Sequence, residues 1–159
     1  MKLRAIVDRF LEILLQVLMA VLVLDVLWQV ISRYLMNSPS SFTDELAGYL
    51  LVWVGLFGAA YVSGKDEHLA IDLLLQRSPP GRRKRIRMII QVCVFAFAAS
   101  VMVVGGTWLV YTRFMLSVKS AALQLSLGYV YLVLPLSGLL ICYYAADNLR
   151  PGFRSRTEE

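Results

Sequence analysis

Four long apolar runs limit what this chain can fold into, because each is long enough to cross a lipid bilayer. A membrane-spanning helix needs about 20 mostly apolar residues. We expect such helices over residues 10–34, 42–63, 88–112 and 125–146, the last with a start anywhere from 121 to 127. Runs of this length without polar alternation are helices rather than barrel strands. We therefore predict an all-α integral membrane protein with four transmembrane helices in one domain, residues 1–159.

The composition excludes the soluble alternatives. Hydrophobic residues make up 58% of the 159 residues and charged residues 17%, whereas soluble domains have about 45–50% apolar and about 25% charged residues. One soluble core of this size does not bury so much apolar surface. Intrinsic disorder is excluded as well, because it requires low hydrophobicity.

The basic residues predict how the chain is oriented in the membrane. Of the 16 Lys and Arg residues, 13 lie before the first helix, between the second and third, or after the fourth. Cytoplasmic loops carry such an excess, so we expect both termini in the cytoplasm. The basic run at residues 82–87 indicates contact with anionic membrane lipids. Nucleic acid is excluded as a partner, because it needs a soluble basic face.

Side chains that would carry chemistry are few and isolated. Cys93 and Cys142 lie inside predicted helices and form no Cys-x-x-Cys pair, so we expect neither a disulfide nor redox chemistry. His68 and Asp72 would share one helix face, but two ligands do not complete a metal site. The apolar residues around them predict a short interfacial segment between the second and third helices. No catalytic motif is found in the sequence, and we expect no enzyme activity, catalytic residue, cofactor or metal.

Asp25 is a carboxyl group inside the first predicted helix, where a charge costs about 2.5–3.5 kcal/mol on insertion scales. Trp28, Gln29 and Ser32 share nearly the same helix face, with Arg33 at its edge. Two interpretations follow: a proton or ion site, or a polar seam packed against another helix. We favour the seam, because the other predicted helices contain no second buried acid.

The second helix begins with a helix-start pattern. Ser41 and Asp44 match a capping box, and Asp44 and Glu45 fall in the first turn, where the helix dipole favours acids. This local role is one interpretation. The other adds a contact of these acids with a partner, either Arg33 in the same chain or a basic group of another chain.

Small residues and one proline interrupt the later helices. Small residues allow helices to approach closely in lipid. Pro135 lacks a backbone donor and crowds the carbonyl of Tyr131, so we expect a bend in the fourth helix. The glycines in question are Gly48, Gly55, Gly58, Gly105 and Gly106.

The stretch FTDELAGYLLVWVGLFGAAYVSGKDEHLAID at residues 42–72 resembles the signature of the small membrane subunit of TRAP transporters, the DctQ-like family. That signature has an aromatic residue, an acid pair, a tryptophan, a Gly-Ala-Ala step, a basic residue and His-x-x-x-Asp. Here these are Phe42, Asp44 with Glu45, Trp53, Gly58 to Ala60, Lys65, and His68 with Asp72. One departure is Phe42, where the family usually has tryptophan.

The resemblance implies a subunit of a sodium-coupled secondary transporter of organic acid-type solutes, placed in the bacterial inner membrane. A periplasmic binding protein delivers the solute, and a large membrane subunit carries it. The small subunit serves as the fixed scaffold of the large one. The resemblance and the polar residues together predict these subunit contacts: Asp25, Gln29, Arg33, Phe42, Asp44, Glu45, Trp53, His68 and Asp72.

A second function stays open at this point. Small four-helix exporters that work as homo-oligomers use one acid in the first helix, and Asp25 occupies a comparable place. The long basic middle loop argues against this proton-coupled exporter. Paired broken helices around a midplane site, the usual pointer to a solute site in a transporter, are not indicated by the sequence.

Overall fold

The computed structural model describes residues 2–35, 40–65 and 80–149. Its elements are α1 (Lys2–Tyr34), α2 (Ser41–Lys65), α4 (Pro80–Phe97), the π-helical segment η1 (Ala98–Gly105), α5 (Gly106–Met115), α6 (Leu127–Tyr131) and α7 (Val133–Asn148). Four helical stretches are long and apolar enough to cross a membrane: Arg4–Tyr34, Ser41–Lys65, Arg85–Met115 and Leu127–Asn148. The predicted class, an all-α protein with four transmembrane helices, is confirmed.

The helices extend beyond the apolar runs from which they were predicted. α1 begins at Lys2 rather than near residue 10, and the third span is helical from Pro80 to Met115 rather than over 88–112. Polar and charged residues at these ends continue the helix outside the hydrocarbon layer, which is why hydropathy does not find them. The segment expected at the interface between the second and third helices lies outside the described residues.

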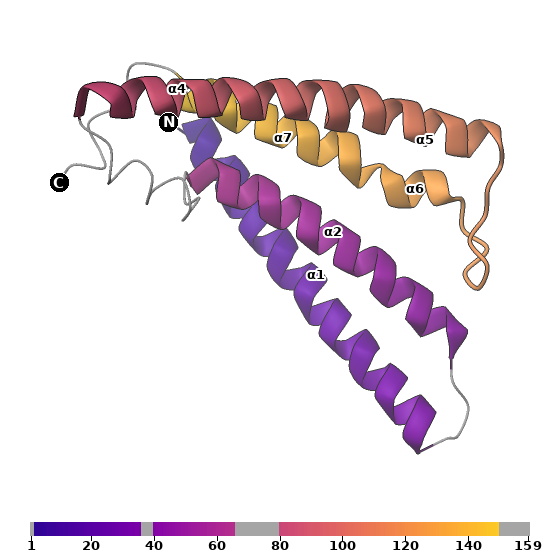
Figure 1. Cartoon of the computed structure of the whole chain (residues 1–159). Helices are drawn as coiled ribbons and strands as arrows, with labels where there is room; N and C mark the ends of the chain where they lie inside the picture. The colour runs from indigo at the N-terminus through magenta and orange to yellow at the C-terminus, as the bar shows by residue number, and fades with distance from the viewer. Residues whose placement is uncertain (1, 36–39, 66–79, 150–159) are drawn as a thin grey trace.

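The four spans form two antiparallel pairs that diverge from one end of the molecule (Figure 1). α1 packs along α2, and the third span packs along the fourth. The fourth span is the central one, because α7 contacts α2 as well as α4 and η1. In its most apolar window 39% of the residues are buried, against 11% for the first span.

In the described part of the chain, two small clusters make up the core, and both lie where α7 meets its neighbours. Many large apolar side chains elsewhere on the helices are exposed, as is usual for surfaces that face lipid rather than water. One cluster consists of Leu11, Phe57, Val133 and Tyr144, and the other of Ala60, Ala98, Met102 and Ile141.

Close helix packing uses only some of the expected glycines. A Cβ added to Gly106 would lie 3.0 Å from the Cβ of Leu134 on α7, so the prediction is confirmed there. At Gly48, Gly55 and Gly58 an added Cβ would have nothing within 4 Å. For contacts within this chain, the prediction is therefore wrong at these three positions of α2, which no described part of the chain packs against.

The fourth span is interrupted at the position where a bend was predicted. α6 ends at Tyr131 and α7 begins at Val133. Pro135 has no N–H to donate to the carbonyl of Tyr131, so the helical hydrogen bonds stop there. The N–H of Leu136 donates to the carbonyl of Leu132 across 3.3 Å, which restarts the helix.

Candidate functional site

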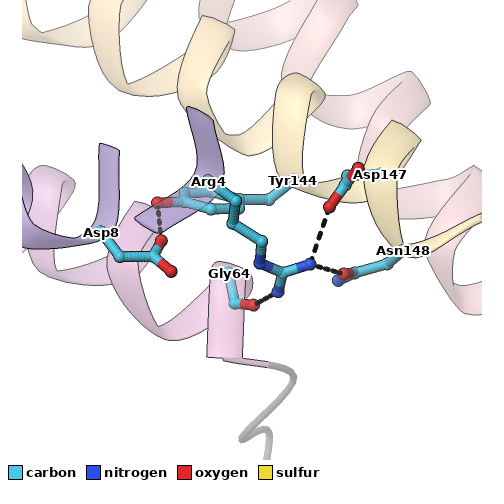
Figure 2. Close-up of polar contacts among 6 residues, drawn as sticks. All are labelled: Arg4, Asp8, Gly64, Tyr144, Asp147 and Asn148. Atoms are coloured by element: carbon cyan, nitrogen blue, oxygen red, sulfur yellow. Dashed lines mark hydrogen bonds and ion pairs between the residues drawn. The ribbon is translucent and has the colours of Figure 1, made fainter. Parts of the chain in front are cut away.

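A group of polar contacts joins three helices at the end of the bundle where α1 begins (Figure 2). We call it the clasp, and it consists of Arg4, Asp8, Gly64, Tyr144, Asp147 and Asn148. The guanidinium group of Arg4 on α1 donates to Asp147 Oδ2 at 2.9 Å and to Asn148 Oδ1 at 3.1 Å, both on α7. It also donates to the carbonyl of Gly64 on α2. One arginine therefore links α1 to the last turns of both α2 and α7.

Tyr144 is the buried centre of the clasp. Its side chain is fully buried, and its hydroxyl donates to Asp8 Oδ1 at 2.5 Å. The guanidinium carbon of Arg4 lies 5.7 Å from the centre of the Tyr144 ring, within the range of a cation–π interaction. The Arg4–Asp147 ion pair has side chains only 16% and 23% exposed, so solvent screens it less than a surface pair.

At the opposite end of the bundle, α1 and α2 are joined by three of the predicted contact residues. Gln29 donates to Asp44 Oδ1, and Arg33 Nη2 lies 3.9 Å from the same oxygen. The contact of Arg33 with Asp44 within the chain is thus confirmed. The side chains of this pair are 53% and 59% exposed, so the ion pair itself contributes little, about 0–1 kcal/mol. Both remain accessible to another chain.

The capping box expected at Ser41 is not formed. α2 already begins at Ser41, and the N–H of Asp44 donates to the carbonyl of Ser40 at 3.4 Å. Among the described residues, the Asp44 carboxylate contacts only Gln29 and Arg33. The reason is that the packing of α1 against α2 brings donors of α1 beside this carboxylate, and they satisfy it instead.

Glu45 holds the loop between the third and fourth spans. Its Oε2 accepts hydrogen bonds from the N–H groups of Ala122 and Leu123, each at 2.9 Å. Ser120 Oγ donates to Oε2, and the N–H of Ala121 to Oε1, at 3.1 Å each. Consecutive backbone N–H groups of this kind form an anion-binding nest. We call residues 120–123 the nest, and Glu45 is the carboxylate that it binds.

The nest is part of a compact turn. The N–H of Ser120 donates to the carbonyl of Leu125 at 2.8 Å, and the N–H of Leu127 donates to that of Val118 at 3.0 Å. Gln124 has a positive φ of 54°, which turns the backbone so that its N–H groups converge. Tyr49, one turn along α2, also donates to Glu45 Oε1 at 2.8 Å. The second helix is thereby attached to the turn that joins the other pair of spans.

The side chain of Trp53 contacts the fourth span where its helix is interrupted. Its indole Nε1 donates to the carbonyl of Val130 at 3.0 Å, in the last turn of α6. A broken helix leaves carbonyls without their usual partners, and such groups need a donor in lipid. Trp53 supplies one from α2, beside Phe57, whose ring it meets edge-on at 5.8 Å between centres.

We expect Trp53→Phe to lower the free energy of unfolding by about 0.6–1 kcal/mol, because it deletes this hydrogen bond and keeps an aromatic ring. Thermal unfolding of the purified chain in detergent, followed by circular dichroism, measures the change. Trp28→Phe is the matched control, since Trp28 is 53% exposed. Equal effects of the two substitutions would contradict the role of the indole N–H.

Asp25 lies in the seam between α1 and α2. It is 9% exposed, and its Oδ2 is buried without a hydrogen-bond partner among the described residues. Ser32, on the same face, is also buried and donates to the carbonyl of Gln29 in its own helix. The stripe therefore faces protein, whereas Trp28 is 53% exposed. Within the described part of the chain, no three His, Cys, Asp or Glu side chains gather where they would hold a metal ion.

The remaining predicted residues are placed as follows. Phe42 is 50% exposed at the start of α2. His68 and Asp72 lie outside the described residues. Cys93 and Cys142 are both free thiols.

Sequence reasoning did not find the clasp or the nest. Arg4 contributed only to the count of basic residues, and Asp8 and Gly64 were not singled out. The available indication was a pair of opposite charges, with Arg4 near the start of α1 and Asp147 near the end of α7. The nest consists of backbone groups, which side-chain patterns do not reveal.

Comparison with known proteins supplies the family. Residues 22–155 match the family described as tripartite ATP-independent periplasmic transporters, DctQ component. A chain of Haemophilus influenzae described as a TRAP transporter small permease protein is 25% identical over 141 residues, which cover 85% of this chain and 82% of the relative. The sialic acid TRAP transporter small permease protein SiaQ of Vibrio cholerae is 29% identical over 65% of this chain and 60% of its own length.

A third relative is a longer protein. The sialic acid TRAP transporter permease protein SiaT of Haemophilus influenzae is 36% identical over 73 residues. These cover 43% of this chain but only 12% of SiaT. The chain thus matches a small part of a large permease as well as separate small permeases.

Proposed function

The chain belongs to the DctQ component family of the tripartite ATP-independent periplasmic transporters, and on this premise we propose that it is the fixed scaffold subunit of a sodium-coupled transporter of organic acid-type solutes. It is a multi-pass protein of the bacterial inner membrane. Its relatives are small permeases of transporters rather than enzymes.

The observation that carries the proposal is that the two pairs of spans are joined by polar contacts at both ends. The clasp joins α1, α2 and α7 at one end, and Glu45 joins α2 to the nest at the other. Trp53 adds a contact between these two ends. A fixed scaffold needs this property, because it must keep its shape while a partner moves against it.

The proposed partners are a large membrane subunit and a periplasmic solute-binding protein. The match to a 12% portion of SiaT supports the first, because it shows a segment like this chain inside a much longer permease. The exposed apolar faces of α1 and α2 supply surface for membrane lipids and for such a partner.

The nine predicted contact residues divide according to their surroundings. Glu45 and Trp53 are used within the chain, and Asp25 is buried in the α1–α2 seam. Arg33, Phe42 and Asp44 are exposed on one end of the α1–α2 pair and are the ones that we propose to meet the large subunit. We retain Gln29, His68 and Asp72 as proposed contacts; Gln29 orients Asp44.

Asp44→Lys tests the partner contact. With the full transporter co-expressed, we expect the recovery of the large subunit with the tagged chain and the uptake of solute to fall by about tenfold or more, because like charges at an interface cost several kcal/mol. Membrane insertion of the chain itself stays unchanged. The double variant Arg33→Glu with Asp44→Lys is the control, since it restores a pair within the chain. If the double variant recovers full uptake, the acid has only a local role.

The scaffold proposal as a whole fails if the chain never co-purifies with a large membrane subunit. The unpaired Oδ2 of Asp25 is the one observation that favours the exporter instead. Proton-coupled transport by this chain alone in liposomes, lost in Asp25→Asn, would establish that second function.

A further inference from the structure

An apolar groove runs along the third span beside the fourth. Its volume is about 540 Å³, and its lining includes Val101, Gly105, Trp108, Leu109, Arg113 and Leu134. We propose that this groove binds one membrane phospholipid, with an acyl chain along η1 and α5 and the phosphate at the guanidinium group of Arg113.

The groove exists because a glycine forms its floor. A Cβ added to Gly105 would meet only the carbonyl oxygen of Ser100 in its own helix, at 3.8 Å. The next residue, Gly106, is packed against Leu134 and Pro135, with an added Cβ only 3.0–3.1 Å from them. Gly106 thus allows the third and fourth spans to pack closely, and Gly105 leaves the space beside this contact open. Trp108, 71% exposed, forms a wall.

The dimensions of the groove fit one leaflet. Val101 and Arg113 are twelve residues apart, which corresponds to about 18 Å at a rise of about 1.5 Å per residue. Half of the hydrocarbon layer is about 15 Å thick. Arg113 lies in the last turn of α5, near the end of the span at Met115, where lipid headgroups begin. An acyl chain that starts at Arg113 is therefore long enough to reach the other end of the groove, at Val101.

The charge at the mouth of the groove is not satisfied by the protein. The Nε of Arg113 is buried and has no hydrogen-bond partner among the described residues. Its guanidinium carbon lies 5.8 Å from the centre of the Tyr131 ring, which orients the group without neutralising it. Arg4 and Arg33, in contrast, each have an acid within 4.0 Å. Among the described residues, Arg113 forms no ion pair with an acid, and a phosphate offers its guanidinium group the bidentate geometry that arginine prefers.

A phospholipid explains both features at once. The long apolar lining suits an acyl chain, and the unpaired cation at one end suits a phosphodiester. A transmembrane helix of a partner would cover the apolar part but would have to bring an acid to the level of Arg113. The lipid needs no such coincidence, since every phospholipid carries its phosphate at that depth.

Native mass spectrometry of the purified full chain, with dioleoyl phosphatidylglycerol added to the detergent, tests the proposal. We expect the wild type to retain one lipid that excess inorganic phosphate does not displace. Arg113→Gln lowers the apparent affinity by about fivefold, the effect of one basic residue near a membrane surface. Gly105→Leu abolishes retention because the new side chain fills the groove.

Matched controls are Arg33→Gln, a second arginine at the same end of the bundle, and Gly55→Leu, which adds the same side chain on the open face of α2. Both keep the lipid. If Gly105→Leu lowers the melting temperature, Val101→Trp blocks the groove from a residue that is 53% exposed. Equal retention in all variants overturns the proposal. The proposal is also overturned if the groove-filling variants lose the large subunit but retain the lipid as the wild type does. The groove would then hold a helix of the partner protein.

Discussion

Glu45→Gln is expected to release the loop between the third and fourth spans from α2. The two carboxylate oxygens together accept hydrogen bonds from three backbone N–H groups of the nest. Glutamine replaces one oxygen with an NH₂ group, which would point a donor at other donors. The N–H groups that bonded to the replaced oxygen then lose their acceptor, although the shape of the side chain is nearly unchanged. Hydrogen bonds to a charged acceptor are also the strongest of their kind.

Hydrogen–deuterium exchange of the full chain in detergent micelles measures this release. We expect the amides of Ala121, Ala122 and Leu123 to exchange about tenfold faster or more in Glu45→Gln. Asp44→Asn is the control, because the neighbouring acid contacts side chains of α1 and no part of the loop. Unchanged exchange at the nest would show that the loop is held by its own turn.

Gly64→Ala is expected to destabilise the clasp even though alanine favours helices. The added Cβ would lie 2.7 Å from Cε1 of Tyr144. The ring is not free to move away, because Tyr144 is fully buried, bonded to Asp8 and covered by Arg4. Overpacking of this kind costs about 1–3 kcal/mol, while Gly to Ala in a helix returns about 0.5–1 kcal/mol. The net loss is about 1–2 kcal/mol.

Gly48→Ala is the matched control for this experiment. It is the same substitution in the same helix, but the new Cβ would have nothing within 4 Å. It therefore gains only the helix term, about 0.5–1 kcal/mol. Thermal unfolding in detergent should shift in opposite directions for the two variants. A similar shift for both would mean that the clasp accommodates the added methyl group without loss of stability.

The number and type of helices were predictable, and their ends were less so. Four apolar runs were sufficient for the four spans, because the cost of exposing backbone groups to lipid leaves no alternative to a helix. The charged first turns of α1 and the start of α4 were missed, since hydropathy reports only the part within the hydrocarbon. The interruption at Leu132 was expected from Pro135, whose missing N–H is a local property.

The candidate site was predictable only where its residues are close along the chain. Arg33 near the end of α1 and Asp44 near the start of α2 are close in the sequence, and their contact was among the interpretations of the sequence. Glu45, the next residue, points to a loop more than 70 positions away. Asp44 and Glu45 belong to the same sequence motif. The rotation of α2 about its axis determines which of them faces α1 and which faces the loop.

Membrane insertion, helix number and family were thus determined by the sequence, because hydrophobicity and a contiguous motif are properties of nearby residues. The joining of the two pairs of spans was decided by the tertiary structure. Arg4 meets Asp147 and Trp53 meets the carbonyl of Val130 only once α2 and α7 are packed together, as they are where Gly64 lies against Tyr144. In lipid the hydrophobic effect does not determine which helix faces meet. The pairing of polar side chains therefore depends on how the helix surfaces fit together.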